Sequence, residues 1–207
     1  MIASGCAKWI IKPASIFLIS LAVAVYTNII LIYIIAGVFL SITIFMLIFF
    51  RDPKRNIPKN PKAVVSAADG TIIKIDSVGD FSRIAVFMSP KDVHINRSPI
   101  QGKVMEIKRF SGSKEPAYKD YSENNERLLT KLSTKIGPVN IVQITGFVAR
   151  RIETYLNKNQ YIEKGQRIGI IKFGSRCDIY IPKNKIRIVA KIGNKVKAGE
   201  SIIAFLK

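Results

Sequence analysis

The sequence predicts a mainly β protein, in which a barrel-sandwich-like all-β domain follows an N-terminal two-helix membrane anchor. Three observations support this fold class. Residues 13–50 contain no charged side chain and are strongly apolar. Short runs rich in β-branched and aromatic residues then recur about every ten residues to the C-terminus. A basic, proline-rich segment, residues 51–62, separates the two regions.

Residues 1–50 are expected to form a membrane-anchoring helical hairpin. The stretch Ile29 to Phe50 is almost pure Ile, Leu, Val, Phe and Ala, and the shorter stretch Ala14 to Thr27 precedes it. The uncharged region is too long for the core of one signal peptide and lacks a convincing small-residue cleavage site. We therefore expect two spans, or a deep hairpin, that stay in the membrane.

Basic residues flank both ends of the apolar region. Lys8 and Lys12 precede it, and five basic residues follow it, namely Arg51, Lys54, Arg55, Lys59 and Lys62. The positive-inside rule then puts both ends in the cytoplasm, whereas a single span would leave the basic groups on opposite sides. The predicted location is the cell (inner) membrane, with the soluble domain facing the cytoplasm.

Residues 51–62 contain three prolines and are expected to form a juxtamembrane linker that does not pack. The β-rich domain should span residues 63–207. Its strands are expected at Ala63 to Ser66, Thr71 to Asp76, Arg83 to Met88, Lys103 to Phe110, Leu128 to Leu132, Val139 to Thr145, Arg167 to Phe173, Arg176 to Ile181, Lys185 to Ala190 and Ser201 to Leu206. A helical turn or two is expected at Phe147 to Tyr155.

An internal echo favours the barrel-sandwich arrangement. The segments Tyr161 to Gly169 and Lys195 to Ile203 each contain a basic-rich turn, a glycine, a polar residue and then a strand. This pattern also occurs in lipoyl- and biotin-carrier barrels. It therefore supplies a rival function, a non-enzymatic lipoyl-like barrel adaptor anchored in the membrane. A carrier needs a lysine on an exposed hairpin tip, whereas Lys172 falls within a predicted strand.

The formal net charge of +19 calls for an anionic partner. The sequence has no zinc-ligand spacing, no helix-turn-helix pattern and no RNP-like aromatic motif, so nucleic acid is not the expected partner. An anionic phospholipid membrane is, because each basic group near its surface contributes on the order of 1 kcal/mol of attraction. Solubility, or the preference of an AT-rich genome for lysine, is an alternative source of part of the excess.

The cysteines and the histidine restrict the metal and redox chemistry that the chain can support. Cys6 precedes the anchor and Cys177 lies in a predicted core strand, so neither a disulfide nor a metal site is expected, and a reduced cytoplasmic compartment is consistent. His94 is the single histidine in the chain, which excludes metal clusters of the multi-histidine kind.

The pair Gly174-Ser175 interrupts two predicted strands at a place where no hairpin turn is needed. A glycine inside a strand usually marks a bulge or a close approach to the backbone. If the bend is strained, the Ser175 hydroxyl could attack the Gly174 carbonyl and convert the amide into an ester. Elimination would then cut the chain between residues 174 and 175 and leave a pyruvoyl group. Taken alone, such a pair is more often a turn or a bulge.

The tract Gly169 to Arg176 resembles the processing site of phosphatidylserine decarboxylase proenzymes, particularly the short bacterial and archaeal form of that family. Further segments match in the same order, namely Ser66 to Gly70, Met88 to Pro99, and Asn125 to Arg127 followed by Gln143 to Ile152. The resemblance covers roughly residues 60–207. The motifs are specific because they occur together.

The resemblance implies a membrane-bound carboxy-lyase that converts phosphatidylserine to phosphatidylethanolamine and carbon dioxide. Self-cleavage would yield a heterodimer of a large chain, residues 1–174, and a small chain, residues 175–207, with Ser175 converted to the pyruvoyl cofactor. That group does the work that pyridoxal phosphate does elsewhere. An ether-linked serine phospholipid is an alternative substrate, because only the headgroup need meet the site.

The resemblance also implies site residues. Asp69 and Ser175 match the aspartate and serine of an Asp-His-Ser processing triad, although Asp69-Gly70 alone would be an ordinary turn. The longer enzymes carry two histidines three residues apart, whereas this chain has His94 and Arg97. Either His94 serves both self-cleavage and later proton transfer, or Asp69 acts with Arg97 and His94 is reserved for decarboxylation; the first is preferred. Arg97 would hold a substrate carboxylate or phosphate well.

Overall fold

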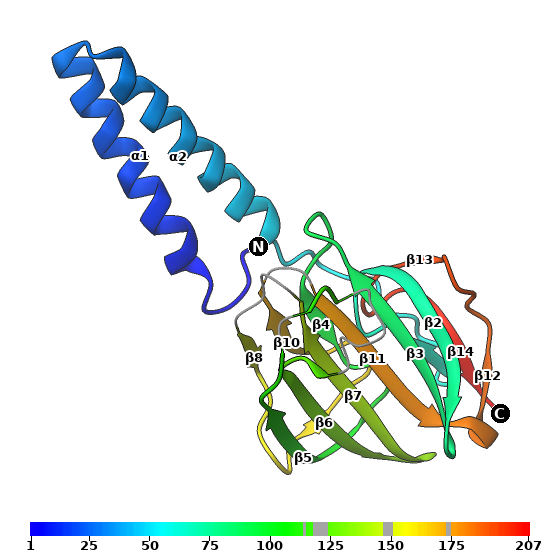
Figure 1. Cartoon of the computed structure of the whole chain (residues 1–207). Coiled ribbons are helices and arrows are strands. Elements are labelled where there is room, and N and C mark those ends of the chain that lie inside the picture. Colours follow the sequence, from blue (N-terminus) through cyan, green and yellow to red (C-terminus); the bar gives the residue numbers. More distant parts are fainter. Residues whose placement is uncertain (114, 118–123, 147–150, 173–174) are drawn as a thin grey trace. The chain divides into compact units, whose positions relative to one another are not determined.

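A computed structural model describes residues 1–113, 115–117, 124–146, 151–172 and 175–207 (Figure 1). It divides the chain into two compact units, Met1–Pro53 and Lys54–Lys207. Two apolar helices make up most of the first unit, and strands dominate the second. The predicted fold class, mainly β with an N-terminal helix pair, is confirmed.

The first unit is a helical hairpin of α1 (Ala7–Thr27) and α2 (Ile30–Phe49). The turn between them is made by Asn28, which adopts the left-handed conformation at φ 53° and donates its backbone N–H to the Ala24 carbonyl. Both helices are long and apolar enough to cross a membrane, by length and composition. α1 begins earlier than the predicted span and includes Lys8 and Lys12.

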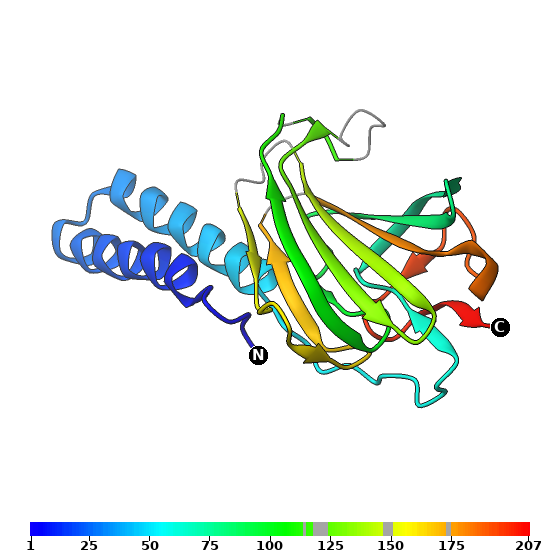
Figure 2. The ribbon, with the colours of Figure 1, turned by 90° about the horizontal axis from the view of Figure 1, so that it is seen from below.

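The second unit is built on an eight-stranded antiparallel sheet in the order β13-β2-β3-β11-β7-β6-β5-β9. Its strands are β13 (Lys195–Val196), β2 (Gly70–Val78), β3 (Phe81–Met88), β11 (Ser175–Pro182), β7 (Gly137–Thr145), β6 (Arg127–Thr134), β5 (Gly102–Phe110) and β9 (Tyr161–Ile162). The sheet curls, as Figure 2 shows, and β11 lies between β3 and β7.

Two three-stranded sheets complete the unit. One has the order β1-β14-β12, made of β1 (Ala63–Val65), β14 (Ile202–Leu206) and β12 (Ile186–Ile188), and a short 3-10 turn, η2 (Lys183–Lys185), leads into β12. The other has the order β4-β10-β8, made of β4 (Ile95–Arg97), β10 (Arg167–Ile171) and β8 (Ile152–Thr154). Each predicted strand overlaps a strand of the structure, whereas β4, β8, β9 and β13, each of two or three residues, were not predicted.

The predicted helical turn at Phe147 to Tyr155 is wrong where the structure describes it. Ile152–Thr154 forms β8, whose residues pair with Gly169 to Ile171 of β10. Ile152 and Thr154 are β-branched and suit this extended edge position. Residues 147–150 lie outside the described part of the chain.

The two segments with similar sequences, residues 161–169 and 195–203, form similar structures. β9 leads to β10 and β13 leads to β14 through turns whose glycines, Gly165 and Gly199, both have φ +78°. A Cβ on Gly199 would lie 3.5 Å from the Gly165 Cα, so the two turns pack against each other. The internal similarity that favoured a barrel-sandwich fold therefore corresponds to two similar structural half-motifs.

The segment that follows α2 has no helix or strand over residues 54–60, as expected of a linker, but it packs on the β-rich unit. The Asn56 N–H donates to Glu200 at 2.9 Å, and Lys164 Nζ donates to the Asn60 carbonyl at 2.7 Å. The expectation that this proline-rich stretch would not pack was therefore wrong. Proline restricts the backbone but leaves the intervening side chains able to bind.

Gly70, which opens β2, provides a stability test of the sheet. Its φ is +143°, and a Cβ there would lie 2.0 Å from the Phe87 carbonyl oxygen. We expect Gly70→Ala to lower the free energy of unfolding by more than about 3 kcal/mol, because β2 and β3 would have to separate. Gly79→Ala is the control, since its φ is +58° and nothing lies within 4 Å of the added Cβ. Left-handed strain alone costs about 1–2 kcal/mol. Equal losses in denaturant titrations would contradict this account.

Candidate active site

Ser175 is the first residue of β11 and is fully buried. It pairs with Met88 of β3 on one side and with Thr145 of β7 on the other. Its hydroxyl lies 3.8 Å from the Met88 sulfur, to which it donates. Gly174, the other half of the predicted cleavage site, lies outside the described residues. The serine is thus held from both sides at the end of a central strand.

Met88, the strand partner of Ser175, is also contacted by β4. Asn96, in β4, donates its side-chain N–H to the Met88 sulfur at 3.5 Å and to the Ala67 carbonyl at 3.3 Å. Gln143 of β7 in turn donates to the Asn96 side-chain oxygen at 2.7 Å. All of these polar groups are buried. Asn96 and Ser175 therefore contact the same sulfur atom, which brings β4 to the Ser175 end of the sheet.

His94 immediately precedes β4 and is fully buried. Its Nδ1 lies 2.9 Å from the Asp92 backbone carbonyl, which can only accept a hydrogen bond. The neutral ring therefore carries its proton on Nδ1, and Nε2 is the basic nitrogen. The His94 carbonyl accepts the Ile171 N–H at 3.3 Å, which places His94 beside the end of β10, the strand that leads towards Ser175.

A turn closed by Asp92 holds this histidine. The Asp92 carboxylate accepts the Ser89 N–H at 2.8 Å and the Ser89 hydroxyl at 2.6 Å, and the Asp92 N–H donates to the Ser89 carbonyl at 2.9 Å. Reasoning from sequence missed Asp92, although its spacing from Ser89 is typical of a side-chain-closed turn.

Asp69 lies at the same end of the sheet. Thr71 pairs with Phe87, and Phe87 pairs with Arg176, so the residue before Thr71 lies level with Met88 and Ser175. Neighbouring strands are about 4.8 Å apart, so the backbones of residues 70 and 175 are separated by about 10 Å across β3. Asp69, His94 and Ser175 thus belong to segments that meet at the end of the sheet where Met88 lies.

The Asp69 carboxylate is buried and accepts three hydrogen bonds. Arg55 Nη2 donates to both of its oxygens, at 2.9 and 2.7 Å, and the Ala198 N–H donates to one of them at 2.8 Å. Burial raises the pKa of Asp69 above its ordinary value of 3.8, although the Ala198 N–H and Arg55 oppose the rise and the charge of Asp92 adds to it. Reasoning from sequence missed Arg55, which lies in the predicted linker.

Arg97 is buried but is not grouped with the other three residues. Its Nη1 donates to the Gly165 carbonyl at 3.0 Å, and a Cβ on Gly199 would lie 2.9 Å from its Cδ. Side chains alternate along a strand, so Arg97 points to the opposite side of β4 from Asn96. Its assignment to substrate binding stays a prediction.

Asn125 braces the other neighbour of Ser175. It is fully buried, and its side-chain N–H groups donate to the Thr145 and Glu115 carbonyls, each at 2.7 Å. Its side-chain oxygen accepts the Ser113 hydroxyl at 2.9 Å and the Glu115 N–H at 2.8 Å. Asn125 therefore fixes the end of β7 where Thr145 pairs with Ser175. The signal for it was its place in the Asn125 to Arg127 segment.

Two further groups limit the chemistry. Lys172 is buried, and its Nζ binds a Glu153 carboxylate oxygen at 2.5 Å, unlike the exposed lysine of a carrier hairpin. Burial raises the pKa of the Cys177 thiol, which therefore stays protonated. Among the described residues, no group of three or more His, Cys, Asp and Glu side chains could hold a metal ion.

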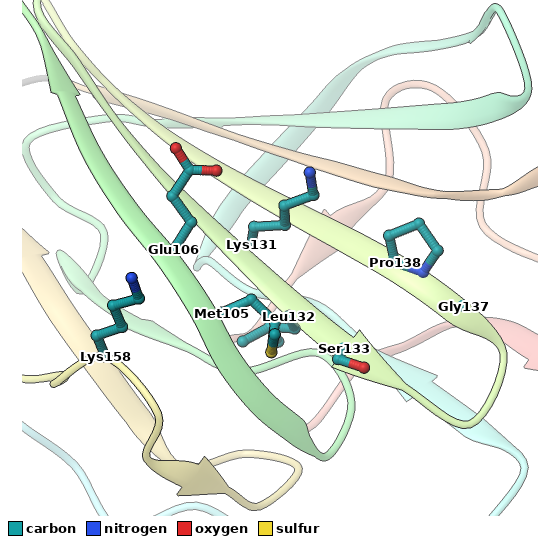
Figure 3. Close-up of a pocket in the computed structure, with 8 residues that line it drawn as sticks. All are labelled: Met105, Glu106, Lys131, Leu132, Ser133, Gly137, Pro138 and Lys158. Atoms are coloured by element: carbon teal, nitrogen blue, oxygen red, sulfur yellow. The ribbon is translucent and has the colours of Figure 1, made fainter.

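A pocket of about 540 Å³ lies over β5, β6 and β7 and is lined in part by Met105, Lys131 and Pro138 (Figure 3). Pro138 is at the start of β7, whereas the partner of Ser175 is at its end. The pocket is therefore separate from the Ser175 site.

Comparison with known proteins identifies the family. Residues 42–204 match the model of the phosphatidylserine decarboxylase family. The chain belongs to that family. A relative from Methanosarcina mazei, provisionally named an archaetidylserine decarboxylase proenzyme, is 41% identical over 208 residues, which cover all of this chain and 98% of the relative. The phosphatidylserine decarboxylase proenzyme of Streptomyces griseus is 44% identical over 155 residues, 74% of this chain and 71% of the relative.

Membership confirms the resemblance and makes the chain an enzyme, a decarboxylase of the phosphatidylserine decarboxylase type. Its relatives are named as proenzymes, and the family is known for a pyruvoyl group. Within this decarboxylase, the matched motifs Met88 to Pro99, Asn125 to Arg127 and Gly169 to Arg176 all contribute residues that lie next to Ser175 or its strand partners.

Proposed function

We propose that the chain cleaves itself between Gly174 and Ser175 and then decarboxylates a serine phospholipid at a membrane surface. The products would be carbon dioxide and the corresponding ethanolamine phospholipid. The observation that carries the proposal is the burial of Ser175 at the first position of β11, at the end of the sheet where the segments that hold Asp69 and His94 also meet. Family membership supports the same reaction.

The described residues fit a pyruvoyl group at position 175. β11 pairs with β3 from Ser175 to Pro182 and with β7 from Ser175 to Tyr180, so a chain end created at position 175 would stay within the sheet. Ser175 is fully buried, which would shield a reactive carbonyl there from bulk solvent. The large and small chains would remain together as a heterodimer, because small-chain strands β11 and β14 pair with large-chain strands β3, β7 and β1.

In the proposed cleavage, His94 Nε2 takes the proton of the Ser175 hydroxyl as its oxygen bonds to the Gly174 carbonyl carbon. The amide C–N bond between residues 174 and 175 breaks and its nitrogen takes up a proton, which leaves an ester. Loss of the Cα proton of residue 175 then breaks its Cβ–O bond and releases residue 174 as a carboxylate. Water converts the resulting dehydroalanine end to pyruvoyl and releases ammonia. Asp69, kept ionised, stabilises the imidazolium formed in the first step.

A pyruvoyl group at position 175 supplies the sink for the electrons that carbon dioxide leaves behind. His94 holds the proton that the substrate carbon then receives. Arg97 remains the predicted ligand of the substrate carboxylate or phosphate, and would have to leave the Gly165 carbonyl to act there. No metal and no nucleic acid enter the proposal.

The proposed setting is the cell (inner) membrane. Residues 1–50 would anchor the chain, residues 51–62 would link the anchor to the enzyme, and residues 63–207 would face the cytoplasm, where the basic excess attracts anionic phospholipid. Anchoring suits a lipid that does not leave the bilayer readily. The name of the Methanosarcina mazei relative favours the ether-linked serine phospholipid as the alternative to phosphatidylserine. A side-by-side assay of the two lipids decides between them.

Intact-mass spectrometry of the denatured protein tests self-cleavage. We expect a C-terminal fragment of residues 175–207 whose first residue is a pyruvoyl group in place of serine, together with the fragment of residues 1–174. A single intact chain, in a preparation shown to be folded by circular dichroism, would contradict the proposal and return the lipoyl-like barrel adaptor to consideration.

A further inference from the structure

Arg55 connects the segment after the anchor to the candidate active site. It follows α2, which ends at Phe49, by a few residues, yet its side chain is only 6% exposed. One terminal nitrogen binds both oxygens of Asp69. A buried arginine that binds a buried carboxylate in this way holds that group in place and keeps it charged.

The backbone around Arg55 is itself held. Glu200 accepts the Asn56 N–H at 2.9 Å, and its other oxygen lies 3.6 Å from Arg55 Nη1. The Ile57 side chain covers Gly165, where an added Cβ would lie 2.5 Å from the Ile57 Cδ1. The Arg55 contact is therefore part of a fixed path for the segment and not a chance pairing of exposed side chains.

We propose that Arg55 is a positioning residue for self-cleavage, which acts by holding Asp69 and so makes the segment that follows the membrane anchor part of the processing site. This inference rests on the proposed self-cleavage. It assigns a role to a residue in a segment that was expected to be only a linker.

The physical reason lies in the groups that face Asp69. Arg55 and the Ala198 N–H favour its charged form, burial and the charge of Asp92 oppose it, and Glu200 acts on it only through Arg55. Arg55 lowers the pKa of Asp69, whereas burial and the charge of Asp92 raise it. Without Arg55, the pKa of Asp69 therefore rises further. Cleavage that requires ionised Asp69 is lost as the pH falls through this pKa. The acid limb of the cleavage rate should therefore move to higher pH.

The experiment follows cleavage of the full chain against pH, in pulse-labelled cell-free synthesis with detergent micelles. We expect the acid limb of Arg55→Ala to lie at higher pH than that of the unchanged protein, with slower cleavage on that limb, because the lost charge no longer favours ionised Asp69. The rate should recover at higher pH. Arg55→Lys, which keeps the positive charge, should restore much of the rate at pH 7.

Arg83→Ala is the matched control. It breaks another arginine–aspartate pair, the buried Arg83 with the half-buried Asp76, which lies towards the opposite end of β2 from Asp69. We expect its pH profile of cleavage to match that of the unchanged protein.

The outcomes are distinguishable. An Arg55→Ala profile with an unmoved acid limb, or faster cleavage than in the unchanged protein, would overturn the inference. If Arg55→Ala fails to fold, Arg55→Gln, which keeps hydrogen-bonding capacity without charge, takes its place and the same acid-limb criterion applies. Absence of cleavage in the unchanged protein would instead overturn the proposed function.

Discussion

We expect Ser175→Ala to leave the protein as one uncleaved chain without decarboxylase activity. Ser175→Ala removes the only oxygen that the proposed cleavage places on the Gly174 carbonyl, so neither the chain break nor the pyruvoyl group can form. The fold should persist, because the lost side-chain contact is one hydrogen bond to the Met88 sulfur. Denaturing gels and intact-mass spectrometry report the chain, and release of carbon dioxide from a carboxyl-labelled serine phospholipid reports the activity.

Ser82→Ala is the matched control for this variant. Ser82 is a buried serine in the neighbouring strand β3, where it pairs with Ile181 at the far end of β11 from Ser175. We expect it to be cleaved and active. Appearance of the fragment of residues 175–207 from Ser175→Ala would show that another group cuts the chain, and would remove Ser175 from its proposed role.

Loss of His94 is expected to abolish decarboxylation. His94→Ala removes the group proposed to hold and deliver the proton, and such acid-base catalysis contributes about 100-fold to 10,000-fold to a rate. The ring is already oriented through its Nδ1 contact with the Asp92 carbonyl, which leaves Nε2 for proton transfer. The measurement is the turnover of detergent-solubilised serine phospholipid by equal amounts of cleaved protein.

The same variant decides between the two readings of Arg97. If His94 serves both steps, His94→Ala also slows self-cleavage. Normal cleavage without decarboxylation would instead favour Asp69 and Arg97 as the cleavage groups, with His94 reserved for the second step. Normal cleavage and normal decarboxylation would show that the acid-base assignment of His94 is wrong. Cys177→Ser, which changes a buried side chain of β11 that has no part in the proposed acid-base steps, serves as the control for a disturbed core.

The sequence by itself determined the features that depend on local composition and short spacing. The two helices could be predicted because each is a long, almost uninterrupted run of apolar residues. The longer strands, β3 and β11 among them, follow from alternating β-branched residues that fill the core. Asp69, His94 and Ser175 were predicted as site residues because each lies within a recognisable motif.

Only the tertiary structure decided how these motifs meet. Met88 gathers Ser175 and Asn96 through contacts between strands that are distant in sequence, and Asp69 is held by Arg55 and by the N–H of Ala198. The direction of Arg97 and the strand at Ile152–Thr154 were likewise set by neighbours supplied by other parts of the chain. Long-range pairing of this kind leaves no periodic trace in a sequence, because each partner satisfies its hydrogen bonds or charge only once the sheets have closed.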